Sequence, residues 1–194
     1  MDTNAKQRNT REENKKIKGN EIPEEWKENP HKLCQKDTDA RWTKKGKAVY
    51  YGYKNHVKAD LESKLIVNYT VTSANVHDSQ ELQKLVNEKD KKIYADTAYS
   101  GETIAEQIPK DIEIQILEKA YRNKPLTEEQ KQRNKEKTKL RCRIEHIFGY
   151  MTNKFKGLTL RYIGMKRAEF NIGLTNLLYN MFRYAFLTAR NTCA

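Results

Sequence analysis

Two runs of alternating apolar residues constrain the fold of this chain more than any other feature. In residues 49–57 the alternating positions hold Val49, Tyr51, Tyr53 and Val57, interrupted by one asparagine, and in residues 65–71 every second residue is leucine, valine or tyrosine. A period of two is typical of β-strands with one buried face. The intervening residues 60–63 are turn-like, so we expect the two strands to form an antiparallel hairpin at the start of a sheet.

Downstream, the chain alternates between helix and strand patterns. Asp78, with Glu81 three residues later, resembles a capping box and predicts the start of a helix. Residues 92–96 predict a third strand, residues 104–108 a short helix, and residues 112–116 a fourth strand. This order predicts an α/β fold.

Two longer helical patterns follow. Pro125 and Thr127 introduce a helix in which apolar residues recur at helical spacing as far as Phe155. A second helix is expected over residues 166–190, and its apolar surface is wide enough to predict that it is largely buried.

Composition narrows the class of protein. The chain has 194 residues and a formal net charge of +12, which favours a polyanion as partner; a basic ribosomal or chaperone-like protein is the alternative. Its three cysteines, Cys34, Cys142 and Cys193, form no Cys-x-x-Cys pair and predict free thiols in a reducing cytosol. The sequence has no apolar run long enough to cross a bilayer, so we expect a cytoplasmic protein without membrane contact.

The amino-terminal part differs in composition from the rest. Residues 1–46 are charged and weakly apolar, with Trp26 and Trp42 as their large anchors, and predict a partly mobile insertion or loop. We expect the main domain to cover residues 47–194. Asp37 and Asp39, in a turn before the sheet, are interpreted as structural.

Two separated carboxylates are the strongest candidates for chemistry. Asp96 follows an apolar strand, and Glu145 lies in a helix rich in lysine and arginine, so together they could hold a divalent cation beside a phosphate backbone. Each has a simpler interpretation. Asp96 could cap a following helix, and Glu145 could be a surface residue paired with Arg141.

Four segments together resemble the DDE-type transposases of bacterial insertion sequences, in the insertion-sequence-five group, with a catalytic domain of the insertion-sequence-four type. They are residues 94–99 (YADTAY), 77–79 (HDS), 37–42 (DTDARW) and 141–149 (RCRIEHIFG). The resemblance implies an RNase H-like mixed sheet flanked by helices. It also implies metal-dependent cleavage and strand transfer of DNA, with two aspartates and one glutamate binding Mg²⁺ or Mn²⁺. Asp96 matches the second aspartate and Glu145 the glutamate.

The sequence differs from the family's pattern at several positions. Arg141 matches the arginine of the family's Tyr-Arg-Glu-Lys signature, but Thr138 and Thr152 stand where its tyrosine and lysine are expected. The family's first aspartate lies on a strand upstream of the segment that begins at Lys6, and Asp2 is out of register with it. We therefore expect the first strand to be missing, and the chain to be the carboxyl-terminal part of a transposase that is inactive alone.

The resemblance and the charge pattern also predict partners. DNA, in the form of terminal inverted repeats, is expected to contact a basic helix and its surroundings through Lys135, Lys139, Arg141, Arg143, Lys154 and Tyr99. His77 is interpreted as part of a helix-entry turn, with an auxiliary catalytic role as the alternative. We expect a homo-oligomer, or pairing with a full-length transposase, at the bacterial nucleoid.

Three hypotheses on function follow from these observations. The chain is a transposase polypeptide, or a non-catalytic remnant that binds DNA or inhibits a full-length transposase, or a product without a stable fold.

Overall fold

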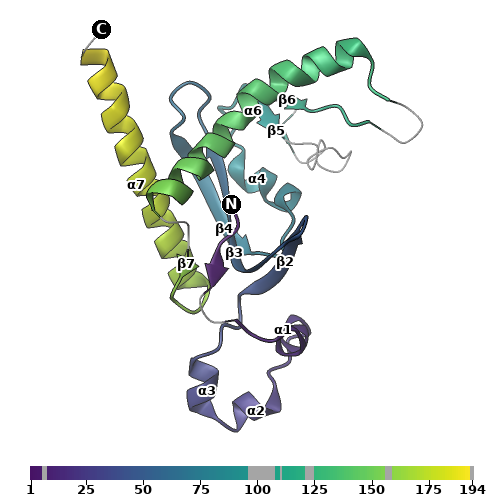
Figure 1. Ribbon diagram of the computed structural model, residues 1–194, viewed down its shortest axis with the longest axis vertical. Helices are drawn as coiled ribbons and strands as arrows, with labels where there is room; N and C mark the ends of the chain where they lie inside the picture. Colours follow the sequence, from purple (N-terminus) through teal and green to yellow (C-terminus); the bar gives the residue numbers. More distant parts are fainter. Residues whose placement is uncertain (6–7, 96–107, 110, 121–124, 156–158, 193–194) are drawn as a thin grey trace. The chain divides into compact units, whose positions relative to one another are not determined.

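A computed structural model describes residues 1–5, 8–95, 108–109, 111–120, 125–155 and 159–192, apart from the side chain of Asn191 (Figure 1). The chain divides into two compact units. The first comprises Met1–His56, Val71–Val76 and Tyr150–Phe182, and the second comprises the other residues. Among the described strands, both parallel and antiparallel pairs occur, and long helices follow them, as predicted for an α/β fold.

The predicted hairpin is confirmed. Strand β3 (Ala48–Ala59) lies between β2 (Arg41–Lys45) and β4 (Ile66–Ser73) in a three-stranded sheet. The β3 to β4 connection is too short for a parallel crossover, so these neighbours run antiparallel. Strand β2 pairs antiparallel with β3 from Arg41 opposite Gly52 to Lys45 opposite Ala48. The pattern of alternation did not predict β2.

The first residues of the chain also run alongside this sheet. The backbone N–H of Thr3 donates to the carbonyl of Tyr53 at 2.9 Å. The backbone of Asp2 forms an isolated antiparallel β-bridge with that of Lys54. Strand β1 (Asn4–Ala5) then pairs in parallel with β7 (Thr159–Leu160). Gly52 on β3 permits the close approach of Thr3, because a Cβ at position 52 would lie 3.0 Å from the Thr3 carbonyl oxygen. The φ angle of Gly52, +149°, is also one that residues with a side chain rarely adopt.

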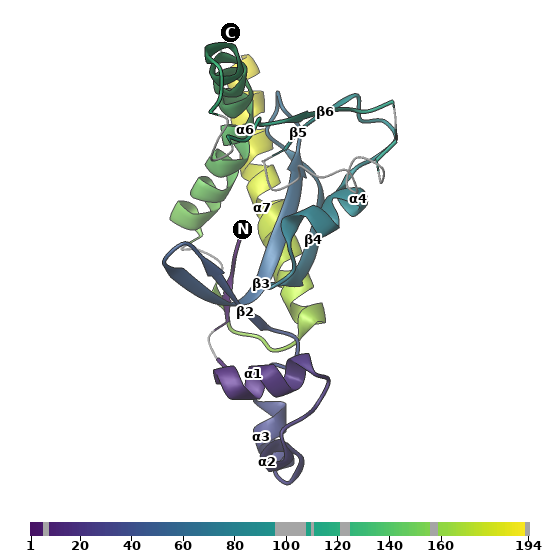
Figure 2. The same cartoon turned by 90° about the vertical axis from the view of Figure 1, so that its right-hand side faces the viewer.

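Three short helices fill most of the charged amino-terminal segment: α1 (Arg11–Lys18), α2 (Glu24–Lys27) and α3 (Pro30–Cys34), which group together in Figures 1 and 2. Helix α1 begins with a capping box between Thr10 and Glu13. The Glu13 carboxylate also accepts from the fully buried Trp26 at 3.2 Å and from Lys36 at 3.0 Å. These contacts link α1, α2 and the segment that follows α3 to one carboxylate.

Burial raises the pKa of Glu13, but hydrogen bonds from the Thr10 backbone and from Lys36, with the charge of Lys36, outweigh this effect and leave the pKa lowered. The carboxylate is therefore the form that stabilises this group of helices.

Asp37 is a buried hub of the first unit. Its carboxylate accepts from the Tyr53 hydroxyl at 2.8 Å and from the backbone N–H groups of Asp39 and Ala40 at 3.0 Å. Burial and the nearby Asp37 charge raise the pKa of Tyr53, so that hydroxyl stays protonated and donates. Asp39 in turn accepts from the backbone N–H of Met165 at 2.8 Å, at the start of helix α7 (Met165–Thr192).

The core of the first unit lies between β3 and the first half of α7. Tyr51, Tyr53 and Ile172 are fully buried there, with Ala168 and Leu160 against them. The aromatic ring of Trp42 packs on Tyr51 with a centroid separation of 4.9 Å. The buried side chain of Asn55 donates its amide N–H to the side-chain oxygen of Asn176 at 2.8 Å. Each of these two buried amides therefore has a hydrogen-bond partner.

The second unit contains the predicted third and fourth strands. Strand β5 (Lys92–Ala95) pairs in parallel with β6 (Glu113–Ile116), from Lys92 opposite Glu113 to Ala95 opposite Ile116. Leu82, Ile108 and Ile112 form its small core with Ile93 beside them. Long helix α6 (Glu128–Lys154), predicted from residue 125, follows.

The helix predicted after Asp78 is shorter than expected. A 3₁₀ turn, η1 (Asp78–Glu81), leads into a single turn of helix, α4 (Leu82–Leu85). The capping residue is His77, not Asp78, and Glu81 pairs with Lys84 at 2.9 Å instead of reaching back to close a capping box. The prediction of a capping box was therefore wrong.

Helix α7 also departs from its prediction. We expected it to be largely buried, yet many of its large apolar side chains are between 41% and 66% exposed. They are Phe170, Leu174, Leu177, Leu178, Met181, Phe182, Tyr184 and Phe186. The buried residues occupy only one face, with Ile172 and Tyr179 on it, so the sequence pattern was right about the helix and wrong about its surroundings.

Candidate nucleic-acid interface

The carboxyl ends of β5 and β6 lie side by side in the second unit. Ala95, the last residue of β5, is opposite Ile116, the last residue of β6. Asp96 and Tyr99, two of the predicted site residues, come directly after β5 and lie outside the described residues. The described part of the site is therefore the edge at Ala95 and Ile116, and the helix attached to it.

Helix α6 is anchored to this edge by several polar contacts. The Lys137 ammonium donates to the Ile116 carbonyl at 3.0 Å. The backbone N–H of Glu118 donates to the Asn134 side chain, and that side chain donates back to the Glu118 carbonyl, both at 2.9 Å. Arg133 forms an ion pair with the Glu118 carboxylate at 3.0 Å, and this hydrogen bond lowers the pKa of Glu118. Figures 1 and 2 both show α6 running beside β5 and β6.

Sequence reasoning missed these anchors. Glu118 and Asn134 belong to no motif, and each is unremarkable alone in a polar stretch. Their pairing depends on a turn that brings residues 16 positions apart into register, which a sequence period does not reveal.

Glu145 lies on an exposed part of α6. Its side chain is 60% exposed and accepts from the Arg141 guanidinium at 2.9 Å, one helical turn earlier. The two side chains therefore share a face of the helix, as expected for an i, i+4 pair. This contact is the simpler interpretation of Glu145, and it also leaves carboxylate oxygen accessible from solvent.

A line of basic residues runs along α6. Lys135, Lys139 and Arg143 are four residues apart, so they follow one face of the helix; we call them the α6 basic stripe. None of the three has an ion pair within the described part of the chain. Lys131, by contrast, is bound to Glu128 at 2.7 Å.

The remaining predicted residues have separate positions. Lys154 is exposed in the last turn of α6. His77 caps η1: its Nδ1 lies 2.7 Å from the Ser79 hydroxyl, in the helix-entry turn to which we assigned it.

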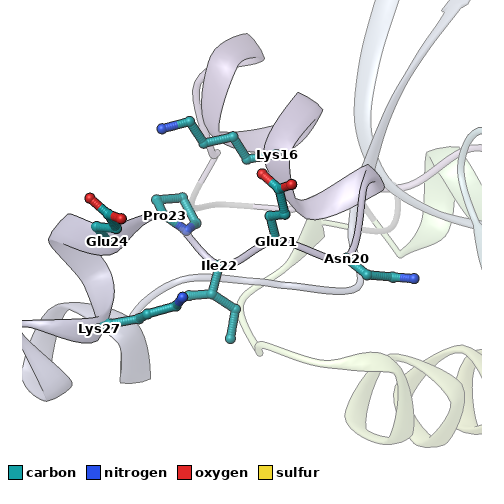
Figure 3. Close-up of a pocket in the computed structure, with 7 residues that line it drawn as sticks. All are labelled: Lys16, Asn20, Glu21, Ile22, Pro23, Glu24 and Lys27. Atoms are coloured by element: carbon teal, nitrogen blue, oxygen red, sulfur yellow. The ribbon is translucent and has the colours of Figure 1, made fainter.

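A hollow of about 630 Å³ lies between helices α1 and α2 (Figure 3). Two lysines and two glutamates contribute to its wall, so it has no excess of positive charge for a phosphate. Its lining residues are Lys16, Asn20, Glu21, Ile22, Pro23, Glu24 and Lys27. The α6 basic stripe, by contrast, consists of cations alone.

A metal centre is not complete in the described residues, which contain no cluster of three histidine, cysteine, aspartate or glutamate side chains. The donor type is nevertheless suitable, because hard carboxylate oxygens are the ligands that Mg²⁺ and Mn²⁺ prefer. None of the helices described in this structure has the length and apolarity to cross a membrane.

A family model for the transposase DDE domain matches residues 7–181 of this chain. The chain belongs to the DDE transposase family. It is similar to a transposase for insertion sequence element IS1106 from Neisseria meningitidis serogroup B, with 32% identity over 173 residues. That match covers 85% of this chain and 58% of the Neisseria protein, so the chain spans little more than half the length of this curated relative. No solved structure matches.

Family membership gives the geometry of α6 a context. DDE transposase domains generally use divalent metal ions, and the family acts on DNA. In this DDE transposase chain, the helix with Glu145 also has the α6 basic stripe, and it is anchored at the edge from which Asp96 follows. Strand β6, Glu145 and the α6 basic stripe therefore lie on connected elements of one unit.

Proposed function

We propose that this chain is a catalytic part of an insertion-sequence transposase, with an RNase H-like fold, and that the whole transposase cleaves DNA strands at element ends and transfers them. The observation that carries the proposal is the anchoring of α6 to the carboxyl end of β6, beside the end of β5. That contact links the two segments with the candidate carboxylates Asp96 and Glu145. The activity would be exerted in the bacterial cytoplasm, at the nucleoid.

Asp96 and Glu145 are the proposed ligands of Mg²⁺ or Mn²⁺. When bound, such a cation supplies charge stabilisation for the attacking and leaving oxygens of a phosphodiester. Arg141 has a positioning role, because its 2.9 Å contact restricts the rotamers of the exposed Glu145 side chain. His77 is a candidate auxiliary residue, beyond its contact with Ser79.

The α6 basic stripe is the proposed contact with DNA phosphates. Successive members are four residues apart, which corresponds to about 6 Å along the helix axis. DNA advances about 3.4 Å per nucleotide, so the spacing approaches that of every second phosphate. Lys154 and Tyr99 are proposed to make further contacts, and the terminal inverted repeats are the proposed DNA.

A second candidate function needs no metal. Lys135, Lys139 and Arg143 can bind phosphate whether or not the carboxylates form a complete centre. The chain would then occupy element ends without cutting them, or pair with a full-length transposase and inhibit it. The share of the relative's length that the chain spans, 58%, makes this alternative worth testing.

The test is strand cleavage by the whole transposase of which this chain is a part, on labelled duplexes that contain the element ends, with and without Mg²⁺ or Mn²⁺; the chain alone is assayed in parallel. The proposal expects metal-dependent nicks that disappear in Glu145→Gln and in Asp96→Asn. Glu136→Gln is the matched control, since it makes the same change on the exposed surface of the same helix. Salt-sensitive binding without nicks would support the second candidate, and equal cleavage by Glu145→Gln and wild type would refute the role of Glu145.

A further inference from the structure

Helix α7 has two apolar faces within the first unit. Its inner face is part of the core, where Ala168, Ile172 and Tyr179 are at most 4% exposed. A helix at a protein surface ordinarily has one apolar face, and its opposite side is polar. The outer face of α7 does not follow this rule.

The outer face repeats with the spacing of a helix-packing seam. Phe170, Leu174, Leu177 and Met181 are separated by four, three and four residues, and each is between 48% and 66% exposed; we call them the α7 seam. At 100° per residue, they lie on the side of the helix opposite Ile172. Alternating steps of three and four residues are the pattern by which two helices interlock as knobs into holes.

The seam carries no charge in an otherwise highly charged chain. Charged residues make up 33% of the sequence, but there is none between Glu169 and Arg183. A surface of this kind has nothing to attract a nucleic acid phosphate. It is also the surface on which a second chain with a net charge of +12 can approach with little local repulsion.

The exposed area is enough for a small dimer interface. Leu178 flanks the seam and is 41% exposed. Aromatic side chains have about 150–250 Å² of surface, and leucine and methionine somewhat less, so the five side chains expose on the order of 100 Å² apiece. Two copies would bury on the order of 1,000 Å², which reaches the size of a specific interface.

We propose that the α7 seam is the surface through which two copies of this chain associate. Because the same surface is used by both copies, the interface is isologous and closes as a dimer. The inference deepens the self-assembly expected for the proposed transposase and rests on it. Its test, however, involves neither DNA nor metal, so a failure of dimerisation and a failure of cleavage are separate results.

The experiment is sedimentation equilibrium of the full chain without DNA, in 0.5 M salt, over a wide range of concentration. Wild type is expected to pass from 22.9 kDa toward twice that mass as concentration rises. Leu177→Glu should raise the dissociation constant at least about thirtyfold, because it places a carboxylate in the centre of each seam. Ala189→Glu, which adds the same charge at an exposed position later on the helix, should leave it unchanged.

Two further measurements separate the interface from folding and from lipid. The thermal midpoint of wild type should rise with concentration, as it does for any dimer, whereas Leu177→Ala, which keeps the helix apolar, should weaken that dependence. A wild-type mass of 22.9 kDa at every concentration would overturn the proposal. It would also fail if Leu177→Glu associated as Ala189→Glu does, or if a monomeric wild type cosedimented with lipid vesicles through this face.

Discussion

The salt dependence of DNA binding tests the α6 basic stripe most directly. Lys135, Lys139 and Arg143 replaced together by alanine remove three cations without an ion-pair partner in the described structure. Each phosphate contact contributes about 0.9 to the slope of log K against log salt concentration, so the magnitude of the slope should fall by about 2.7. Between 50 and 200 mM salt, the variant should therefore lose about fortyfold less affinity than wild type.

A matched variant separates local contact from net charge. Lys84, Lys131 and Arg133 are each bound to a glutamate, at 2.9, 2.7 and 3.0 Å. Replacing these three by alanine lowers the net charge by the same amount, but it removes cations that are already engaged, so the slope should change by less than about one. Fluorescence anisotropy with a labelled duplex, at five or more salt concentrations, measures both slopes. Equal slopes for the two variants would refute the assignment of phosphate contacts to the stripe.

Three further changes test the first unit. Asp37→Ala should cost about 3–6 kcal/mol in the free energy of unfolding, because it strands the buried Tyr53 hydroxyl and two backbone N–H groups; a loss below about 1 kcal/mol in urea denaturation would contradict this. Glu13→Gln should destabilise the protein at pH 7, and the difference from wild type should shrink progressively as pH falls below 4.5. The lowered pKa of Glu13 means that its contribution is complete above its ordinary value of 4.5 and disappears as pH falls through the folded value; a difference that is constant with pH would argue against the ion pair. Gly52→Ala should release the strand at Thr3 from β3, seen as faster amide exchange there, since a Cβ would lie 3.0 Å from the Thr3 carbonyl oxygen; unchanged exchange would rule this out.

Elements with a strong hydrophobic period were predictable from the sequence. Strands β3 and β4 follow from alternation, and α6 and α7 from helical spacing, because burial of one face imposes those periods. Strand β1 was not predictable, since two residues give no period and its pairing with β7 depends on segments more than 150 positions apart. The glycine that makes room for the first residues gives no sequence signal of that role.

The candidate site was predictable in part. The i, i+4 spacing of Arg141 and Glu145 placed both on one face of a helix, and the structure has them in contact. The exposure of α7 was not predictable, because an apolar pattern shows that a face avoids water and does not show what covers it. The anchors at Glu118 also depend on tertiary register, as described above.

The hub at Asp37 has a consequence for biosynthesis. Its carboxylate lies 3.4 Å from the backbone nitrogen of Gly164, which is 127 positions later in the chain, and Asp39 bonds Met165 across 126 positions. At about 5–20 residues per second, a ribosome needs on the order of ten seconds to add the intervening residues. During that interval, Tyr53 and the helices beside it have no closing partner from α7. Completion of the first unit therefore depends on a late, long-range closure, and until then the polar groups around Asp37 lack their partners from the start of α7.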